Sequence, residues 1–524
     1  MVQINIKRYV TFLIGVLSMS CNDTVDLPPL SAPNEAVIAG IDSIYQVLPG
    51  GRLQIKANVS FTKDPAADPS RYRYEWFRLQ KVGYIGPGED YRSVGMSPVL
   101  DLEMPASRDQ GAYDFMLRVT DLQTNLFTEK EFRVFVANDI YEGWILLGEK
   151  QGEATLDMLS YRLQQERYEH IANPQWKYHA TGALKGKPLF VRFGIGSVFG
   201  YYNGYLAVGT SEEAIAFGSD EFSRENELAG TSDLYEYLPT AGSVDFSRVF
   251  FDGSLNSMFI YVDGNLFVDS YGTSLPSFRK IADFMDADGT LRPVRLSSRF
   301  AVSNRYSTEQ TAVVYDEQAK EFLWMKAEDA YVNELYPGRL FDFKTGQELL
   351  YVGYTEREGG QYVALLQDTD GGDTYLARFS MYDQRYYEKI NVPLIDEAEQ
   401  VALSTTTGEL YYSVGSRLFV IDEAAKESRP VLDVGGATIS VIKFNSFVTT
   451  VRSYSPFFPW LTTAGGARYK ILQDQLVVCT YDPLAPDDSG IFRLFTVDPQ
   501  AGALVETYRY EGFPKIVDVT YKER

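Results

Sequence analysis

Apolar and polar residues alternate in short runs between residues 36 and 137, and turn-forming residues separate these runs. The run 53–61 is LQIKANVSF, and the run 111–121 places Tyr113, Phe115, Leu117 and Val119 at alternate positions. Because successive side chains of a strand point to opposite faces, each run predicts a strand with one buried face. Trp76, within YRYEWFRL, stands where a core residue is expected. The pattern therefore predicts a small β-sandwich over residues 36–137.

Hairpin-like pairs of apolar runs continue through residues 138–524, with starts about 55 residues apart on average. Such spacing is typical of four-stranded propeller blades, which bury their faces only by stacking on neighbours. The spacing favours seven blades over six or eight, and a pair of unrelated β-sandwiches is the alternative. The last run, with Ile516, Val519 and Tyr521, is predicted to join the first blade and close the ring. Seven hairpins begin near Trp144, Tyr205, Met258, Ala312, Tyr362, Leu410 and Leu476.

Composition supports an all-β chain and narrows its function. The 524 residues include 37 tyrosines, 32 phenylalanines and 42 glycines, but only 10 methionines, which is typical of strands joined by turns. A formal net charge of −22 argues against nucleic acid as a partner, because the surface would repel phosphates. Only two histidines, His170 and His179, are present, which leaves few routes to imidazole catalysis or zinc binding.

The first residues have the pattern of a secretion signal. Lys7 and Arg8 precede an apolar run of about 11 residues, which is too short to span a bilayer and ends at Ser20 and Cys21. The segment LSMSC at 17–21 resembles the lipobox of bacterial lipoproteins, in particular the Bacteroidetes type. The resemblance implies a signal peptide at 1–20, acylation of Cys21, a lipidated spacer at 21–35 and attachment to the outer membrane bilayer. It leaves open whether the protein faces the cell surface or the periplasm.

Trp76 and the strand that begins Gly-Ala-Tyr at Gly111 resemble the polycystic-kidney-disease (PKD) and immunoglobulin-like folds, in which a tryptophan of the third strand packs on such a strand. The lipobox, this module and the large β region together resemble the PKD-like family lipoproteins of Bacteroidetes. That resemblance implies an accessory role beside a starch-utilisation-type receptor complex, or in binding a glycan.

Familiar catalytic and cofactor motifs do not occur, so no catalytic residue, cofactor or metal site is predicted. The loop 368–373, DTDGGD, has enough carboxylates for calcium, but a plain hairpin turn is the favoured interpretation. The loop 286–289 is interpreted in the same way. With Cys21 acylated, Cys479 has no disulfide partner, and its strand-like surroundings predict a small buried apolar residue.

One segment places aromatic side chains where a loop is expected. Two prolines exclude the sequence RSYSPFFPW, residues 452–460, from a central strand. Its aromatic rings either fold back over the core or bind a ligand at one end of the propeller channel. The candidate ligand-binding residues are Tyr454, Phe457, Phe458 and Trp460.

These patterns together predict a lipid-anchored accessory binding protein that assists capture of a nutrient, either glycan or peptide, or docks a partner. A propeller glycoside hydrolase or polysaccharide lyase is the first alternative, and it requires paired carboxylates at the floor of the channel. A structural surface scaffold is the second alternative. The composition favours a binding protein over an enzyme.

Overall fold

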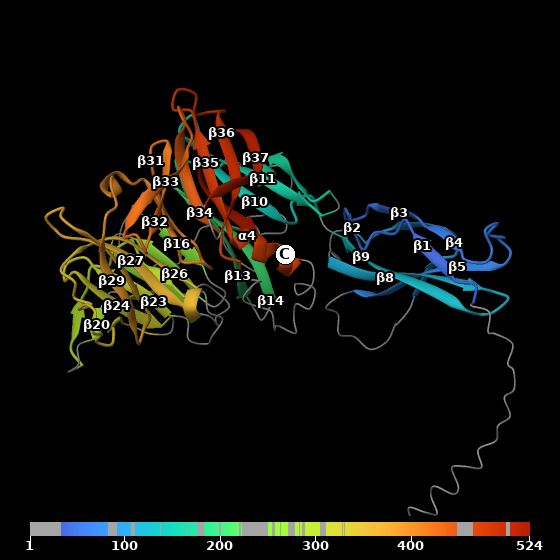
Figure 1. Cartoon of the computed structure of the whole chain (residues 1–524), viewed down its shortest axis with the longest axis horizontal. Helices are drawn as coiled ribbons and strands as arrows, with labels where there is room; N and C mark the ends of the chain where they lie inside the picture. Colours follow the sequence, from blue (N-terminus) through green and yellow to red (C-terminus); the bar gives the residue numbers. More distant parts are fainter. Residues whose placement is uncertain are drawn as a thin grey trace, which may run out of the picture.

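The structure is a computed structural model, and it confirms an all-β chain in which a β-sandwich is followed by a β-propeller (Figure 1). The signal peptide, Cys21 and most of the spacer lie outside the described residues. The structure describes residues 33–81, 92–105, 111–136, 138–163, 165–175, 183–198, 201–218, 222, 250–253, 257–262, 264–270, 278–281, 283–285, 289–303, 311–326, 329, 331–447, 465–498 and 503–523.

The sandwich contains a five-stranded sheet in the order β2-β9-β8-β5-β6, together with the pairs β1–β4 and β3–β7. Strand β2 runs parallel to β9, and the other pairings are antiparallel. Residue 137, at the predicted domain boundary, is not described, so the predicted bounds stay a prediction. The strands are β1 (Ala36–Ala39), β2 (Ile44–Val47), β3 (Arg52–Lys56), β4 (Asn58–Phe61), β5 (Tyr72–Lys81), β6 (Arg92–Gly95), β7 (Val99–Glu103), β8 (Gly111–Asp121) and β9 (Phe127–Val136).

Trp76 lies at the centre of the sandwich core. It is fully buried, its indole Nε1 donates to the Ser97 carbonyl at 2.7 Å, and its ring meets Phe132 edge-on at 5.9 Å between centroids. The donated hydrogen bond matters because a buried indole N–H without an acceptor costs free energy. The alternate residues of β8 face the same core, as their period of two predicts.

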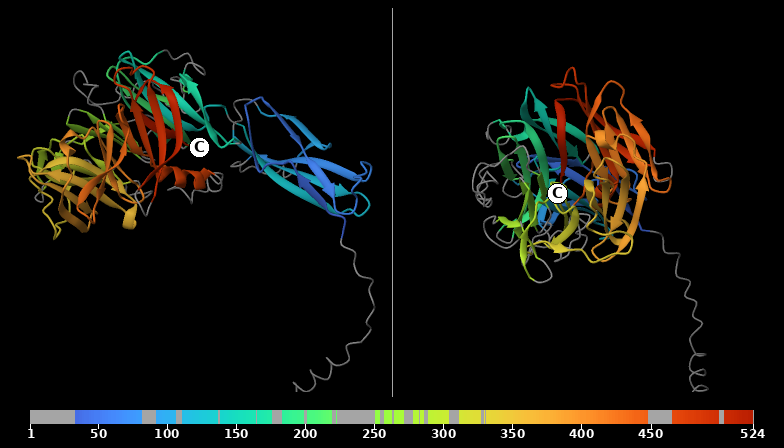
Figure 2. Two further views of the ribbon diagram at one scale, coloured as in Figure 1. Left: turned by 45° about the horizontal axis from the view of Figure 1, so that its top comes forward. Right: turned by 90° about the vertical axis from the view of Figure 1, so that its left-hand side faces the viewer.

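The propeller follows as a series of antiparallel sheets (Figure 2). Among the described residues, six of these sheets have four strands and the β13-β14-β15 sheet has three. A small hairpin, β20–β21, stands apart from them. The strands are β10 (Gly143–Lys150), β11 (Glu153–Arg162), β12 (Arg167–Ala172), β13 (Pro188–Val198), β14 (Tyr201–Thr210), β15 (Ala214–Gly218), β16 (Phe250–Gly253), β17 (Ser257–Val262), β18 (Asn265–Ser270), β19 (Phe278–Ile281), β20 (Asp283–Met285), β21 (Leu291–Pro293), β22 (Ala301–Val302), β23 (Thr311–Asp316), β24 (Glu321–Lys326), β25 (Asn333–Glu334), β26 (Glu348–Thr355), β27 (Gln361–Gln367), β28 (Thr374–Phe379), β29 (Gln384–Ile390), β30 (Gln400–Leu403), β31 (Leu410–Val414), β32 (Arg417–Asp422), β33 (Glu427–Asp433), β34 (Thr438–Phe444), β35 (Gln475–Tyr481), β36 (Gly490–Val497), β37 (Leu504–Phe513) and β38 (Lys515–Lys522).

Each hairpin predicted from the sequence lies in a separate sheet, which confirms the seven blades. These hairpins are β10–β11, β14–β15, β17–β18, β23–β24, β27–β28, β31–β32 and β35–β36. The innermost strand of each sheet contacts the innermost strand of a neighbouring sheet, as in the pairs β13–β38, β34–β38 and β30–β34. The described helical segments are η4 (Arg357–Gly359), η5 (Ile395–Glu397) and α4 (Gly465–Gln473).

Successive sheets bury their apolar faces against each other. Val363 and Leu365 of β27, for example, share a core with Leu410 and Tyr412 of β31. Comparable cores join the other neighbouring sheets whose facing side chains are described, including the last sheet and the first. No sheet buries both faces alone, so the stability of each depends on its neighbours.

Strand β38 closes the ring. It pairs antiparallel with β10, where Tyr521 lies opposite Trp144 and Val519 lies opposite Leu146. The first sheet thereby takes its innermost strand from the far end of the chain, as the final apolar run predicted. No helix in the described part of the chain is long and apolar enough to cross a bilayer.

Candidate functional site

The outermost strand of the β22–β25 sheet is interrupted. Strand β25 has only two residues, and after Glu334 the chain leaves the edge of β24. It returns at Phe343, whose carbonyl accepts from the Phe322 amide at 2.9 Å, and Lys344 then forms a bridge with Glu321. The intervening segment contains Pro337 and Gly338, which do not favour a continuous strand. The excursion leaves part of the sheet edge open.

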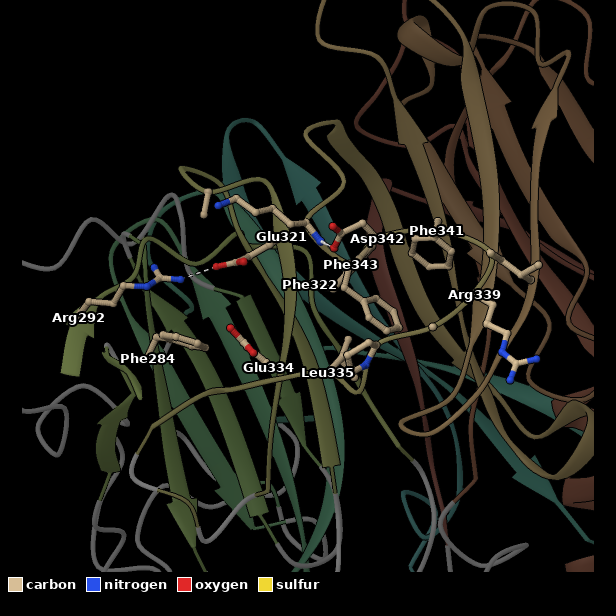
Figure 3. Close-up of a pocket in the computed structure, with 15 residues that line it drawn as sticks. Phe284, Arg292, Glu321, Phe322, Glu334, Leu335, Arg339, Phe341, Asp342 and Phe343 are labelled. Atoms are coloured by element: carbon tan, nitrogen blue, oxygen red, sulfur yellow. Dashed lines mark hydrogen bonds and ion pairs between the residues drawn. The ribbon is translucent and has the colours of Figure 1, made fainter. Parts of the chain in front are cut away.

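A pocket of about 870 Å³ occupies this opening (Figure 3). The hairpin β20–β21 supplies Phe284 and Arg292, and the start of β24 supplies Glu321 and Phe322. Ala319 and residues of the segment 334–344 complete the lining. The pocket therefore joins three parts of the propeller at its outer wall.

The side chain of Gln384, on β29, fixes the excursion. Its Oε1 accepts from the amides of Leu340 at 2.8 Å and Phe341 at 3.1 Å, and its Nε2 donates to the Phe341 carbonyl at 2.8 Å. The Phe341 ring also stacks on Tyr387 with centroids 4.7 Å apart. Because the Gln384 side chain binds both the amide and the carbonyl of Phe341, this wall of the pocket is preformed.

Arg292 is the cation at the pocket wall. Its guanidinium lies 2.5 Å from a carboxylate oxygen of Glu321 and 3.2 Å from one of Asp316, and 4.3 Å from the centroid of the Phe284 ring. Burial alone lowers the pKa of Arg292, but the two carboxylates outweigh it and the pKa is raised. Arg292 therefore stays charged, and its charge is already balanced by the protein.

Glu334 is the carboxylate that the protein leaves available. Its side chain is exposed and has neither an ion pair nor a hydrogen bond to the described residues. Figure 3 shows the carboxylate directed into the pocket between Phe284 and Glu321. A carboxylate in this position accepts hydrogen bonds from hydroxyl or ammonium groups of a ligand.

Two exposed tyrosines lie beside the pocket. Tyr336 and Tyr382 are 58% and 78% exposed, and their ring centroids are 5.4 Å apart with an interplanar angle of 34°. Tyr336 directly follows Leu335 and precedes Pro337, both of which line the pocket. Large aromatic side chains with this exposure offer flat apolar surfaces to a ligand.

The innermost strands carry a different polar cluster. Asp518 of β38 accepts from the Val191 amide at 3.0 Å, lies 3.1 Å from the Lys443 ammonium and pairs with Arg192. Burial raises the pKa of Asp518, but Arg192 and Lys443 more than offset this, and the pKa is lowered. Asp518 is thus an ionised link between β38, β13 and β34, and its oxygens are occupied by protein donors.

The predicted aromatic residues Tyr454, Phe457, Phe458 and Trp460 lie outside the described residues. The helix α4, which follows them in sequence, lines a second pocket of about 880 Å³ together with Tyr161, Tyr508 and residues 42–44 of the sandwich. On α4, Arg468 pairs with Glu142 and lies 3.9 Å from the centroid of the Tyr161 ring. No helix is predicted at this position from the sequence.

The loop 368–373 is the turn between β27 and β28. The Asp368 amide donates to the Asp373 carbonyl at 3.0 Å, and Gly371 has the positive φ of 73° that such a turn requires. The Asp373 carboxylate lies 2.5 Å from the Lys389 ammonium, and Asp368 accepts from Gln347 at 2.9 Å. In the described part of the chain, no group of three or more histidine, cysteine or acidic side chains is placed to hold a metal.

Two other titratable residues singled out from the sequence, His170 and Cys479, lie in ordinary strand positions. His170 of β12 is 2.8 Å from Asp157, and its ring meets Phe513 edge-on. Cys479 is fully buried on β35, and burial raises the pKa of its thiol, as suits a small apolar core residue. His179, Asp286 and Asp288 lie outside the described residues.

Comparisons with solved structures find only distant likenesses. A quinonprotein alcohol dehydrogenase-like protein from Bacteroides thetaiotaomicron is 10% identical, with a TM-score of 0.40, and the match covers 94% of this chain and 100% of that chain. YCF48 from Cyanidioschyzon merolae is 11% identical, with a TM-score of 0.32, and covers 65% and 96%. A GH74 xyloglucanase from Xanthomonas campestris is 10% identical, with a TM-score of 0.33, and covers 79% and 66%. Likeness at this level says nothing about activity.

The sequence comparisons identify one part of the chain. No curated protein matches this chain. The model of the PKD-like family matches residues 31–188, which include the whole sandwich and continue through β10, β11 and β12 of the first propeller sheet. The N-terminal part of this chain therefore contains a PKD-like module.

Proposed function

We propose that this chain is a lipid-anchored accessory binding protein of the outer membrane, and that its propeller captures a glycan at the pocket beside β25. The observation that carries the proposal is the pairing of an exposed aromatic platform, Tyr336 and Tyr382, with a preformed pocket that contains the available carboxylate of Glu334. Sugar rings present apolar faces to such platforms, while their hydroxyls donate to carboxylates.

Pocket size and rigidity support capture of a small polymer segment. A volume of about 870 Å³ lies within the range of small-molecule sites. The hydrogen bonds of Gln384 hold the wall before any ligand arrives, which reduces the entropy lost on binding. The position of the pocket on the outer wall leaves room for a chain that extends beyond it on either side.

The anchor and the partner complete the proposal. Acylation of Cys21 would hold the protein at the membrane, since several buried acyl chains anchor stably. A starch-utilisation-type receptor in the same membrane would take the captured material onward. The following experiment distinguishes glycan capture from three alternatives. These are binding of a peptide, a purely structural role and cleavage of a glycan.

The test is calorimetric titration of the full mature chain, made soluble by Cys21→Ala, with a panel of oligosaccharides and with a mixture of short peptides. We expect an oligosaccharide to bind and the double variant Tyr336→Ala/Tyr382→Ala to lose at least about tenfold in affinity, the equivalent of about 1.4 kcal/mol. Glu334→Gln should weaken binding as well.

Glu399→Gln is the matched control, because Glu399 is also an exposed carboxylate and lies on the connection into the next sheet. It should bind as the unaltered chain does. Equal affinity for all variants would place the ligand elsewhere, and binding of peptides alone would contradict a glycan ligand. Release of new reducing ends from a polysaccharide would show a hydrolase instead.

A further inference from the structure

Three large apolar side chains project from the β8–β9 turn of the sandwich. Leu122, Leu126 and Phe127 are 44%, 49% and 57% exposed. They lie within six residues of sequence at the end of the sandwich that is remote from the propeller (Figure 1). Exposed apolar residues are ordinary when scattered, but a cluster at one tip indicates a contact surface.

The turn presents these side chains rigidly. The Asp121 amide donates to the Leu126 carbonyl at 2.9 Å, and the Asn125 amide donates to the Asp121 carbonyl at 2.8 Å. The Asp121 carboxylate also accepts from the Gln123 amide at 2.9 Å. These bonds fix the backbone, so little conformational entropy is lost when the tip meets a surface.

Two carboxylates near the tip, those of Asp121 and Glu129, are paired with arginines. Asp121 lies 2.6 Å from the Arg71 guanidinium, and Arg118 lies 2.7 Å from Glu129. The Arg118 guanidinium also lies 4.8 Å from the centroid of the Phe127 ring. Asp121 and Glu129 are thus each neutralised by an arginine, which reduces their repulsion of an anionic lipid surface.

The beginning of the described chain lies at the same end of the sandwich. The Asn34 amide side chain donates to the Asp121 carboxylate at 3.2 Å and to the Tyr72 hydroxyl at 2.8 Å. Even when fully extended, the chain from Cys21 to Asn34 spans no more than about 45 Å. An acyl group on Cys21 would thus keep this end of the sandwich, rather than the propeller, close to the bilayer.

We propose that the β8–β9 turn is a membrane contact, in which Leu122, Leu126 and Phe127 enter the interfacial layer of the bilayer that holds Cys21. The inference rests on the proposed acylation. A convex turn with three apolar side chains suits insertion among lipid head groups and is much smaller than a stable protein interface. The contact would set the orientation of the sandwich and hold the propeller away from the membrane.

The test uses the full acylated chain in phosphatidylethanolamine and phosphatidylglycerol vesicles, with an environment-sensitive dye on Gln123→Cys. A second sample carries the dye on Leu48→Cys, an exposed position toward the propeller end of the sandwich. We expect blue-shifted emission and quenching by brominated lipid at position 123, and neither at position 48. Cys479 is fully buried and does not compete for the dye.

Leu126→Ser/Phe127→Ser should abolish the quenching at position 123 while the protein still floats with the vesicles. The control Met96→Ser/Val99→Ser removes two comparably exposed apolar side chains from the same sandwich and should leave the quenching unchanged. A protein that floats while the dye at 123 stays in water would overturn the membrane contact alone. A protein that does not float would contradict the acylation, and the inference would fail with it.

Discussion

The sandwich and the propeller both bury aromatic-rich strands, but they differ in how far apart in the sequence their contacting residues lie. The sandwich core comes entirely from residues 36–136. The closing seam of the propeller joins residues from the two ends of the ring: Glu142 accepts from the Tyr521 hydroxyl at 2.8 Å, and Asp518 accepts from the Val191 amide. We therefore expect the sandwich to fold independently, whereas the propeller depends on its last strand.

Removal of residues 515–524 gives the largest expected effect. Without β38, the first sheet loses its innermost strand and Trp144 loses Tyr521, which packs on it edge-on with centroids 5.0 Å apart. The propeller should fail to fold, while the sandwich keeps its near-ultraviolet circular dichroism and resistance to proteolysis. If the midpoint of the propeller's unfolding transition were unchanged by this truncation, the stability of the ring would not depend on β38.

Trp76→Ala tests whether the sandwich unfolds independently of the propeller. The substitution leaves a cavity in the sandwich and should destabilise it by about 3–5 kcal/mol. Thermal unfolding followed by calorimetry should show the sandwich transition at a lower temperature and the propeller transition unmoved. A matching downward shift of both transitions would mean that the two regions unfold as one unit.

Asp518→Asn should destabilise the propeller by about 2–3 kcal/mol at neutral pH, because hydrogen bonds to a charged group are replaced by weaker ones. The lowered pKa of Asp518 means that the folded state binds this proton less readily than the unfolded state. The stabilisation by the carboxylate is therefore complete above the unfolded pKa of about 3.9, and it is lost as the pH falls through the lower folded pKa. Urea denaturation at pH 7 and pH 3 measures this. If the free energy of unfolding differed between Asp518→Asn and the unaltered chain by the same amount at both pH values, Asp518 would not be an ionised link.

Asp114→Asn provides the smallest expected effect. Asp114 pairs with Arg133 at 2.8 Å across β8 and β9, but both side chains are about a third exposed. Water screens such a pair, so the sandwich should lose well under about 1 kcal/mol. Denaturation of this variant beside Asp518→Asn compares a local, screened ion pair with a buried one that joins distant strands. If both variants lost the same free energy of unfolding, the buried pair would be no more stabilising than the screened one.

The sequence allowed the hairpins to be predicted because their signal is local. Alternation within a strand and a turn beside it lie within about 20 residues, as in β31–β32 and in β17–β18. The same applies to Trp76 and to β8, whose alternate residues all reach the sandwich core. The closing strand was predictable for a different reason, since a ring of sheets requires some strand to cover its open edge.

The pocket beside β25 could not be predicted, because its partners come from separate parts of the chain. Arg292, Glu321 and Gln384 meet the segment 334–344 only when the sheets stack. The sequence around Pro337 and Gly338 signals a break in a strand, but it does not show that the chain returns to the same edge at Phe343. The link from Asp518 to Val191 and Lys443 is hidden for the same reason.

Hydrogen exchange of the full mature chain, with and without a bound oligosaccharide, tests the central claim most directly. The account predicts that slowed exchange on ligand addition is confined to the segment 334–344, the β20–β21 hairpin and the turn that carries Tyr382. Slowed exchange at residues 452–460 instead, or along β38 and β13 around the channel, would contradict it.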